Sequence, residues 1–235
     1  MRWLSSVFVC LFLFACAATE VVHDGPVVKA GSLLLLPVES AFDELQDEEG
    51  EVYQALLASL KERRFTVLAV DAETHQAAIE EALTEAGAIY SPELGRFTPS
   101  NKDRYIKALI DYYAEKQPAD IVLMPEFVVR RASVSGDWAE WDYVRRKIEL
   151  DPKPPGPYQS VQQVRGVSLR LAAYTASGAQ VMQDFAGVSL PYRIDYTRRP
   201  PAFVLKDHFY NRKQINETIA LLTASLFRYV EYDER

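Results

Sequence analysis

The chain has 235 residues, of which 49% are hydrophobic and 25% are charged, a composition typical of a folded globular protein rather than a disordered one. Its 33 acidic and 26 basic residues give a net charge of -7, which argues against a general nucleic-acid-binding protein because such proteins need a basic surface. Two cysteines are too few for a disulfide-rich scaffold or a four-cysteine zinc site.

The N-terminal 16 residues predict a secretory leader. Arg2 supplies a positive charge, and the apolar run that follows over residues 3–15 is shorter than the roughly 20 residues that span a membrane. The run ends in Leu13-Phe14-Ala15-Cys16, which resembles the lipobox of bacterial lipoproteins. The alternative is an ordinary signal peptide in which Cys16 is incidental.

The lipobox resemblance implies a covalent membrane anchor. In that family, cleavage precedes the cysteine, its thiol carries diacylglycerol, and its new amino group carries a fatty acyl chain such as palmitate. Ala17 and Ala18 follow Cys16 where lipoproteins of other destinations carry Asp, as in lipoproteins sorted to the outer membrane. We therefore expect a signal peptide over residues 1–15, lipidation of Cys16, a tether over residues 16–30 and a single domain over residues 31–235.

Strands and helices alternate in the first half of this domain. Apolar runs typical of buried strands occupy residues 32–38, 66–70 and 121–124. Helical periodicity predicts amphipathic helices over residues 48–64 and 72–86, and Thr98-Pro99-Ser100 is the start signal of a third helix.

The second half of the domain shows hairpins and one more helix. One hairpin joins residues 125–132 and 141–148 through a turn at 135–137, and another joins residues 167–174 and 179–188 through Gly178. An aromatic-rich surface loop is expected before the final helix, which covers residues 211–230. This order predicts an α/β fold with a mixed sheet, three-layer-like, with helices on both sheet faces.

The order of elements resembles a group of envelope lipoproteins that includes the curli secretion channel subunit and the activators of penicillin-binding proteins. The matching pieces are Ala-Asp-Ile-Val-Leu-Met at residues 119–124 and the strand–turn–strand segment around Thr175-Ala176-Ser177-Gly178. The chain departs from the group at Ala173-Tyr174-Thr175, where the group usually has Val-Asp-Ala, and no Trp closes the second strand. The resemblance implies an envelope location and a noncatalytic accessory or assembly role, and it transfers no catalytic residue.

No catalytic, metal or cofactor site is predicted. His23, His75 and His208 lack the spacing of zinc ligands and are expected on the surface. The sequence contains no nucleophile elbow and no glycine-rich phosphate loop. The acidic run over residues 39–51 is expected to be a solvated helix entrance, with a calcium loop as the alternative.

Charge is divided unevenly along the chain. Residues 20–125 contain 9 basic and 20 acidic residues, whereas residues 126–235 contain 16 basic and 13 acidic ones. The first hairpin concentrates arginines and tryptophans, and because strand residues alternate between faces, two or three of the cations are expected to share a face. We predict these candidate partner-binding residues: Arg130, Arg131, Trp138, Trp141, Arg145 and Arg146. The alternatives are charges that protect a sheet edge and tryptophans that close the hairpin.

These observations predict a noncatalytic envelope lipoprotein. We expect it to be anchored by its covalent lipid, on the periplasmic side of the outer membrane, and to serve as an accessory or scaffold in an envelope protein complex. Its partners would be the membrane and an envelope protein, or further copies of itself, and no nucleic acid. A small-ligand-binding module and a periplasmic hydrolase using convergent carboxylates are the alternatives.

Overall fold

The computed structural model describes residues 26–40, 46–87, 90–91, 96–152, 163–199, 201–206 and 210–234. Two predicted features lie outside these residues: the leader over residues 1–15 and the first part of the tether over residues 16–25, which includes Cys16 and His23. His208 also lies outside them. Within the described part of the chain, no helix is both long and apolar enough to cross a membrane.

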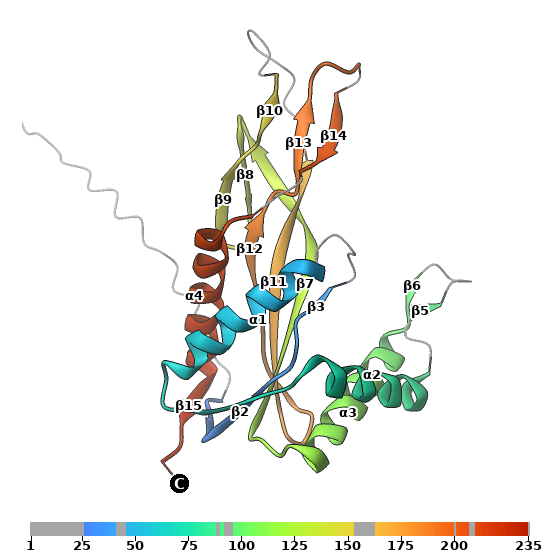
Figure 1. Ribbon diagram of the computed structural model, residues 1–235, viewed down its shortest axis with the longest axis vertical. Coiled ribbons are helices and arrows are strands. Elements are labelled where there is room, and N and C mark those ends of the chain that lie inside the picture. Colours follow the sequence, from blue (N-terminus) through green and yellow to red (C-terminus); the bar gives the residue numbers. More distant parts are fainter. Residues whose placement is uncertain are drawn as a thin grey trace, which may run out of the picture.

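A mixed sheet forms the centre of the molecule (Figure 1). Its main strands run in the order β12-β11-β7-β2-β4, with β2 parallel to β4 and β7, and β11 antiparallel to both of its neighbours. Their bounds are β2 (Ser32–Leu35), β4 (Thr66–Ala69), β7 (Ile121–Ser135), β11 (Gln163–Thr175) and β12 (Gln180–Ser189). A short strand, β3 (Glu39–Ser40), also pairs with β7, as does the hairpin of β8 (Trp138–Trp141) and β9 (Val144–Lys147).

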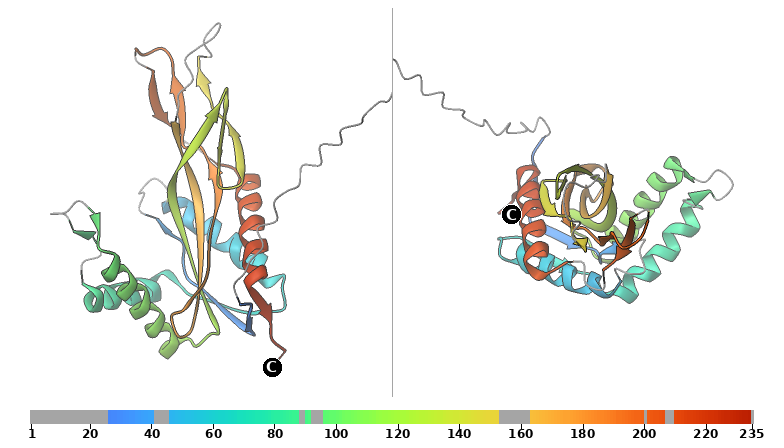
Figure 2. Two further views of the ribbon diagram at one scale, coloured as in Figure 1. Left: turned by 180° about the vertical axis from the view of Figure 1, so that it is seen from behind. Right: turned by 90° about the horizontal axis from the view of Figure 1, so that it is seen from above.

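Helices cover both faces of the lower part of this sheet, as the sequence predicts (Figure 2). On one face lie α1 (Gln46–Lys61) and α4 (Arg212–Tyr229), and on the other lie α2 (Ala72–Ala86) and α3 (Pro99–Lys116). The predicted mixed α/β fold is therefore confirmed.

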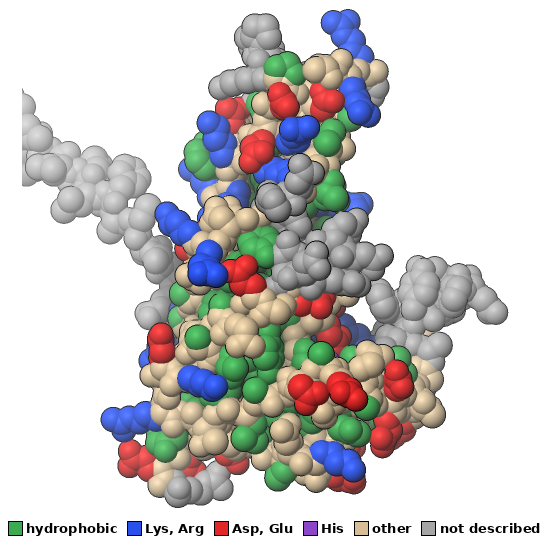
Figure 3. Space-filling model, in the orientation of Figure 1, with side chains coloured by type: hydrophobic (Ala, Val, Ile, Leu, Met, Phe, Trp, Pro, Cys, Tyr) green, Lys and Arg blue, Asp and Glu red, His purple; other side chains and the backbone are tan. Residues whose placement is uncertain are grey.

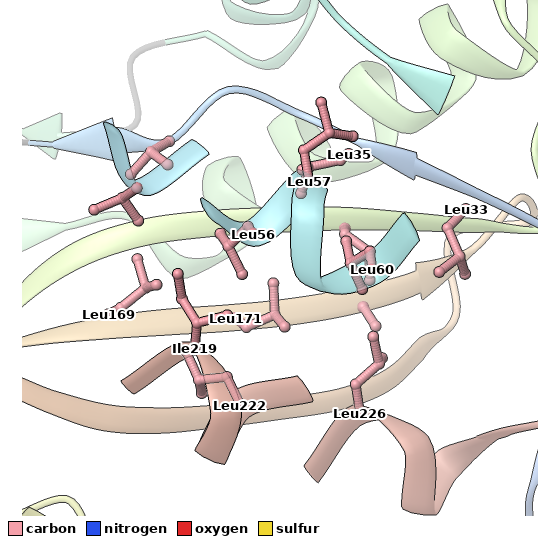
Figure 4. Packing of buried hydrophobic residues seen from close by; sticks show 14 of the residues in the cluster. Leu33, Leu35, Leu56, Leu57, Leu60, Leu169, Leu171, Ile219, Leu222 and Leu226 are labelled. Atoms are coloured by element: carbon pink, nitrogen blue, oxygen red, sulfur yellow. The ribbon is translucent and has the colours of Figure 1, made fainter. Parts of the chain in front are cut away.

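Leucines are the commonest residues of the core between the sheet and the helices α1 and α4 (Figure 4). Each fully buried leucine contributes about 1.5–3 kcal/mol relative to an exposed one. The labelled members are Leu33, Leu35, Leu56, Leu57, Leu60, Leu169, Leu171, Ile219, Leu222 and Leu226.

Local signals define the ends of the helices. The Asp71 side chain accepts a hydrogen bond from the Thr74 backbone N–H at 2.8 Å and caps α2, which ends at Gly87 with φ +76°. Asn211 and Gln214 form a capping box at the start of α4. Both helices match their predicted ranges because capping and periodicity are local properties of the sequence.

Three segments differ from prediction. The end of the expected tether forms β1 (Val28–Ala30), which pairs in parallel with β15 (Val230–Tyr232) after α4. The expected aromatic-rich loop contains β13 (Tyr192–Asp195) and β14 (Ala202–Leu205), which form a small sheet with β10 (Leu150–Asp151). A short hairpin, β5 (Tyr90–Ser91) with β6 (Arg96–Phe97), precedes α3. These pairings rest on contacts that no local pattern encodes.

The first predicted hairpin contains two turns rather than one. The chain reverses at Gly136–Asp137 after β7, as expected, and reverses again between β8 and β9 at Asp142 and Tyr143, which have φ values of 36° and 64°. The second turn carries no glycine to mark it, which is why the sequence pattern missed it.

Candidate interaction surface

The alternation of side chains along β8 and β9 separates the predicted binding residues into two sets. Trp138 is 39% exposed, whereas Trp141, three positions later, is 6% exposed and belongs to a core cluster under the hairpin. Residues on successive strand positions face opposite sides, so a spacing of three places the two tryptophans on opposite faces. Trp141 therefore cannot serve as the surface contact that the sequence suggested.

Two glycines make room for the buried tryptophan. A Cβ atom at Gly166 would lie 2.3 Å from Cε2 of Trp141, and one at Gly187 would lie 2.9 Å from its Nε1. The indole N–H donates to Ser168 Oγ at 3.0 Å, and the Ser168 hydroxyl in turn donates to Asp142 Oδ2 at 2.7 Å. Trp141 thus fixes the β8–β9 hairpin on β11 and β12.

Arg130 and Arg146 also have structural partners. The Arg130 guanidinium pairs with Asp142, with 3.0 Å between Nε and Oδ2, and its Cζ lies 4.4 Å from the centre of the Phe185 ring. Arg146 pairs with Glu217 of α4 at 3.0 Å. Both side chains therefore tie the hairpin to the rest of the domain instead of forming a free basic patch.

The remaining predicted residues lie together on the outward face of four adjacent strands, β9, β8, β7 and β11. Strand register places Arg131 opposite Arg165, Glu140 opposite Arg145, and Trp138 opposite Lys147. All six of these side chains are exposed. We call the following set the basic face: Arg131, Trp138, Arg145, Lys147 and Arg165.

Arg131 and Arg165 are directly opposed like charges on the basic face. Directly opposite residues on neighbouring strands have Cβ atoms about 4.5–5.5 Å apart, and like charges in this position destabilise the strand pair. Among the residues that the structure describes, neither guanidinium lies within ion-pair distance of a carboxylate. The two guanidinium groups therefore lie exposed and side by side on the outer face of the sheet.

Trp138 and Arg145 give the same surface an aromatic element. The Arg145 Cζ lies 4.9 Å from the centre of the Trp138 ring, and its Nε pairs with Glu140 at 3.0 Å. Both members of that ion pair are more than half exposed, so the pair adds little to stability. Tryptophan and arginine are the residue types that dominate binding energy at protein interfaces. Sequence reasoning missed Arg165 and left Lys147 out of the site, because only strand register brings them to this face.

Next to the basic face, the β8–β9 turn presents Tyr143, which is 72% exposed. The pKa of its phenol is raised, chiefly by the nearby Asp184 carboxylate and then by partial burial. A bulky residue in the left-handed region is unusual, and such backbone strain concentrates at functional positions. Tyr143 is thus a second exposed aromatic of the hairpin, near Asp184 of β12 and Arg228 of α4.

His75 overturns the expectation of a surface histidine, because it is only 4% exposed. Its Nδ1 lies 2.9 Å from the Tyr113 hydroxyl oxygen, and its Nε2 lies 3.4 Å from Oε1 of Glu39. Burial raises the pKa of Tyr113, and burial together with Glu39 raises that of Tyr105, so both phenols stay protonated near neutral pH. The signal missed in the sequence was the helical spacing of His75 with Ala78, Ala82 and Ala86, the buried stripe of α2.

Two further features bear on the alternative functions. Burial, and then the nearby Glu39, raise the pKa of Glu49, so these two carboxylates interact. A groove of about 380 Å³ lies between α3 and the β11–β12 hairpin, with Lys102, Arg170 and Tyr174 among its lining residues.

Within the described ranges, no three His, Cys, Asp or Glu side chains gather as metal ligands would.

Comparison with known proteins finds distant structural likeness. No family model and no curated protein matches the chain. One similar structure is a PelC dodecamer from Paraburkholderia phytofirmans, at 11% identity over 86% of this chain and 92% of that one, with a TM-score of 0.38. Another is lipoprotein GNA1162 from Neisseria meningitidis, at 12% identity over 84% and 99%, with a TM-score of 0.34. The hypothetical protein CT253 from Chlamydia trachomatis matches at 10% identity over 84% and 97%, with a TM-score of 0.37. Likeness at this level assigns neither an activity nor an assembly to this chain.

Proposed function

We propose that the chain is a lipid-anchored protein of the bacterial cell envelope that has no catalytic role and acts as an accessory or scaffold subunit. The anchor is the lipid on Cys16, and the protein faces the periplasm from the outer membrane. The basic face binds an acidic surface of a protein partner in the same envelope. The support for the anchor is the leader sequence, with Arg2, an apolar run and the lipobox-like Leu13-Phe14-Ala15-Cys16.

The cross-strand pair of Arg131 and Arg165 is the observation that carries the binding proposal. Two uncompensated guanidinium groups on adjacent strands repel each other, and this cost is removed when a partner supplies carboxylates between them. Trp138, which stacks with Arg145 at the other end of the basic face, provides an aromatic anchor of the kind found at interface centres. Hydrogen bonds of Trp141 and Asp142 with Ser168 hold the β8–β9 hairpin against β11. The surface is therefore ordered before binding, which lowers the entropic cost of association.

Site-specific photocrosslinking in cells tests both parts of the proposal. A photoreactive phenylalanine analogue placed at Trp138 should crosslink to one defined envelope protein in the membrane fraction. The crosslink should weaken at least about tenfold in an Arg131→Ser, Arg145→Ser, Arg165→Ser variant, because three positive charges that face the acidic surface of the partner are removed together. The matched control, Lys102→Ser with Arg104→Ser on α3, should leave the crosslink unchanged.

The lipid anchor is tested in the same cells by measuring where the protein fractionates and what mass it has. Cys16→Ser should either release the protein into the soluble periplasmic fraction or leave the uncleaved precursor, which is heavier by its leader. Membrane association with unaltered mature mass in this variant would contradict the lipid anchor. An undiminished crosslink in the triple arginine variant would contradict the role of the basic face.

A further inference from the structure

Helix α2 presents an acidic face that forms no ion pair with the described part of the chain, although Glu80 accepts a hydrogen bond from the Gln76 side chain at 3.1 Å. Its outward side carries Glu73, Glu80, Glu81 and Glu85, and the helix contains no lysine or arginine. Among the described residues, no lysine or arginine lies within ion-pair distance of these four carboxylates. In the orientation of Figure 3, carboxylates gather over the region of α2, while basic side chains are spread along the upper strands.

The spacing of charges on α2 is similar to the spacing on the basic face. At 1.5 Å per residue, Glu73 and Glu80 are about 10 Å apart along the helix axis. Strands lie about 4.8 Å apart, which separates β7 from β9 by about 10 Å. Arg145 is in line with Ser133 of β7, and Arg131 lies two residues from Ser133, so Arg131 and Arg145 are about 12 Å apart. A helix laid across these strands would bring its glutamates over successive cations.

Apolar side chains flank the charges on both surfaces. Leu83 of α2 is 38% exposed, and the basic face carries Trp138, which is 39% exposed. An interface of this kind combines an apolar contact with surrounding ion pairs. Within one molecule α2 lies in the lower body and β8 and β9 in the upper strands, so the two surfaces do not meet (Figure 1).

We propose that the acidic face of α2 in one copy docks on the basic face of a second copy of this chain. The inference rests on the proposed role of the basic face as a binding surface and names its partner. The contact is heterologous, because it joins different surfaces of the two copies, and each pair of copies keeps one free surface of each kind. Repetition of the contact therefore generates a closed ring or an open chain rather than a dimer.

Charge reversal with complementation tests this pairing. The full-length chain is purified from the cell fraction in which it occurs, in mild detergent where that fraction is the membrane, and its mass is measured by analytical ultracentrifugation. We expect the wild type to exceed the monomer mass and to dissociate as salt is raised from about 50 to 500 mM, since salt screens exposed charges. One variant reverses α2 (Glu73→Lys, Glu80→Lys, Glu81→Lys, Glu85→Lys), and the other reverses the basic face (Arg131→Glu, Arg145→Glu, Lys147→Glu, Arg165→Glu).

Each variant alone should associate at least about 100-fold more weakly than the wild type, because like charges then face each other across the contact. An equimolar mixture of the two variants should associate again, because each acidic surface now meets a basic one. Circular dichroism checks that both variants fold, and neutral Gln variants replace either set where it does not. The control is Glu62→Lys with Glu115→Lys, two exposed acidic residues outside α2, and it should leave the mass unchanged.

Three outcomes overturn the inference: a wild type that stays monomeric at low salt, association that neither reversal weakens, or a mixture of the two variants that fails to recover. A monomeric wild type whose basic face still crosslinks to a different envelope protein would overturn the second copy as partner while leaving the proposed function in place.

Discussion

Trp141 and the two glycines beneath it set the position of the hairpin that carries the basic face. Gly166 lies on β11 and Gly187 on β12, and a side chain at either position would occupy the space of the indole ring. The atoms nearest to a Cβ at Gly166 belong to the buried indole ring, and the atom nearest to a Cβ at Gly187 is Cγ2 of the buried Val144, at 2.1 Å. An additional methyl group at either position would therefore force the surrounding side chains or backbone to shift, which destabilises the fold.

Gly166→Ala should lower the free energy of unfolding by about 2–4 kcal/mol, because the new methyl group overlaps the Trp141 ring. Urea denaturation followed by tryptophan fluorescence measures the change. Gly50→Ala in α1 is the matched control, because a Cβ there meets no atom within 4 Å. It should instead stabilise the protein by about 0.5–1 kcal/mol through helix propensity. Equal effects of the two substitutions would contradict the proposed packing.

The turn between β8 and β9 is an element in which local strain coincides with an exposed aromatic. Both central residues have positive φ, the geometry for which Asn-Gly and Asp-Gly are preferred in two-residue hairpins. Asp142 is held in place by Ser168 and Arg130, and its carbonyl oxygen accepts the Gly187 N–H at 2.9 Å. Tyr143 contributes exposed surface, so its large side chain is retained at a cost in backbone energy.

Tyr143→Gly should raise the free energy of unfolding by about 0.5–1 kcal/mol, because it relieves the left-handed strain while removing an exposed side chain. Asp142→Gly, one residue earlier in the same turn, should lower it, since the relief of left-handed strain is outweighed by loss of the hydrogen bonds to Ser168 and Arg130. Thermal unfolding of the two variants measures both signs. Destabilisation by Tyr143→Gly would show that the tyrosine has a structural role in the turn.

Across the whole molecule, the parts predicted from sequence are those with local signals. The helices α2 and α4 and the buried strand β2 follow from periodicity, caps and apolar runs. Of the candidate surface, Arg131, Trp138 and Arg145 were predicted, whereas Arg165 joins them through pairing of β7 with β11 across a long intervening segment. Register between such distant strands depends on tertiary packing, which a single sequence does not specify.

Strand alternation by itself separates Trp138 from Trp141 in the sequence. The order Trp138-Ala139-Glu140-Trp141 places one tryptophan on the same face as a glutamate and the other on the same face as an alanine. The glutamate marks the outward face, so Trp141 belongs to the core. The helical spacing of His75 with three alanines likewise indicates a core position for that histidine.

The two ends of the described chain meet at the pairing of β1 with β15. Val28 lies opposite Val230, the Asp233 N–H donates to the Ala30 carbonyl oxygen at 2.9 Å, and the Tyr232 ring packs edge-on against Phe65 with centroids 5.6 Å apart. The segment that follows the predicted anchor is thereby fastened directly to the end of α4. Residues beyond Tyr229 thus hold the first strand in place.

A chain that ends at Tyr229 should lose the protection of the amides of Val28–Ala30 from hydrogen exchange, because their partner strand is absent. Its free energy of unfolding should fall by about 1–3 kcal/mol, since Phe65 loses its contact with Tyr232 and the paired backbone groups lose their partners. Amides of β7 in the centre of the sheet should keep their protection and serve as the internal control. Hydrogen exchange read by mass spectrometry distinguishes the two regions, and unchanged protection of β1 would show that this strand is held by the body of the domain without β15.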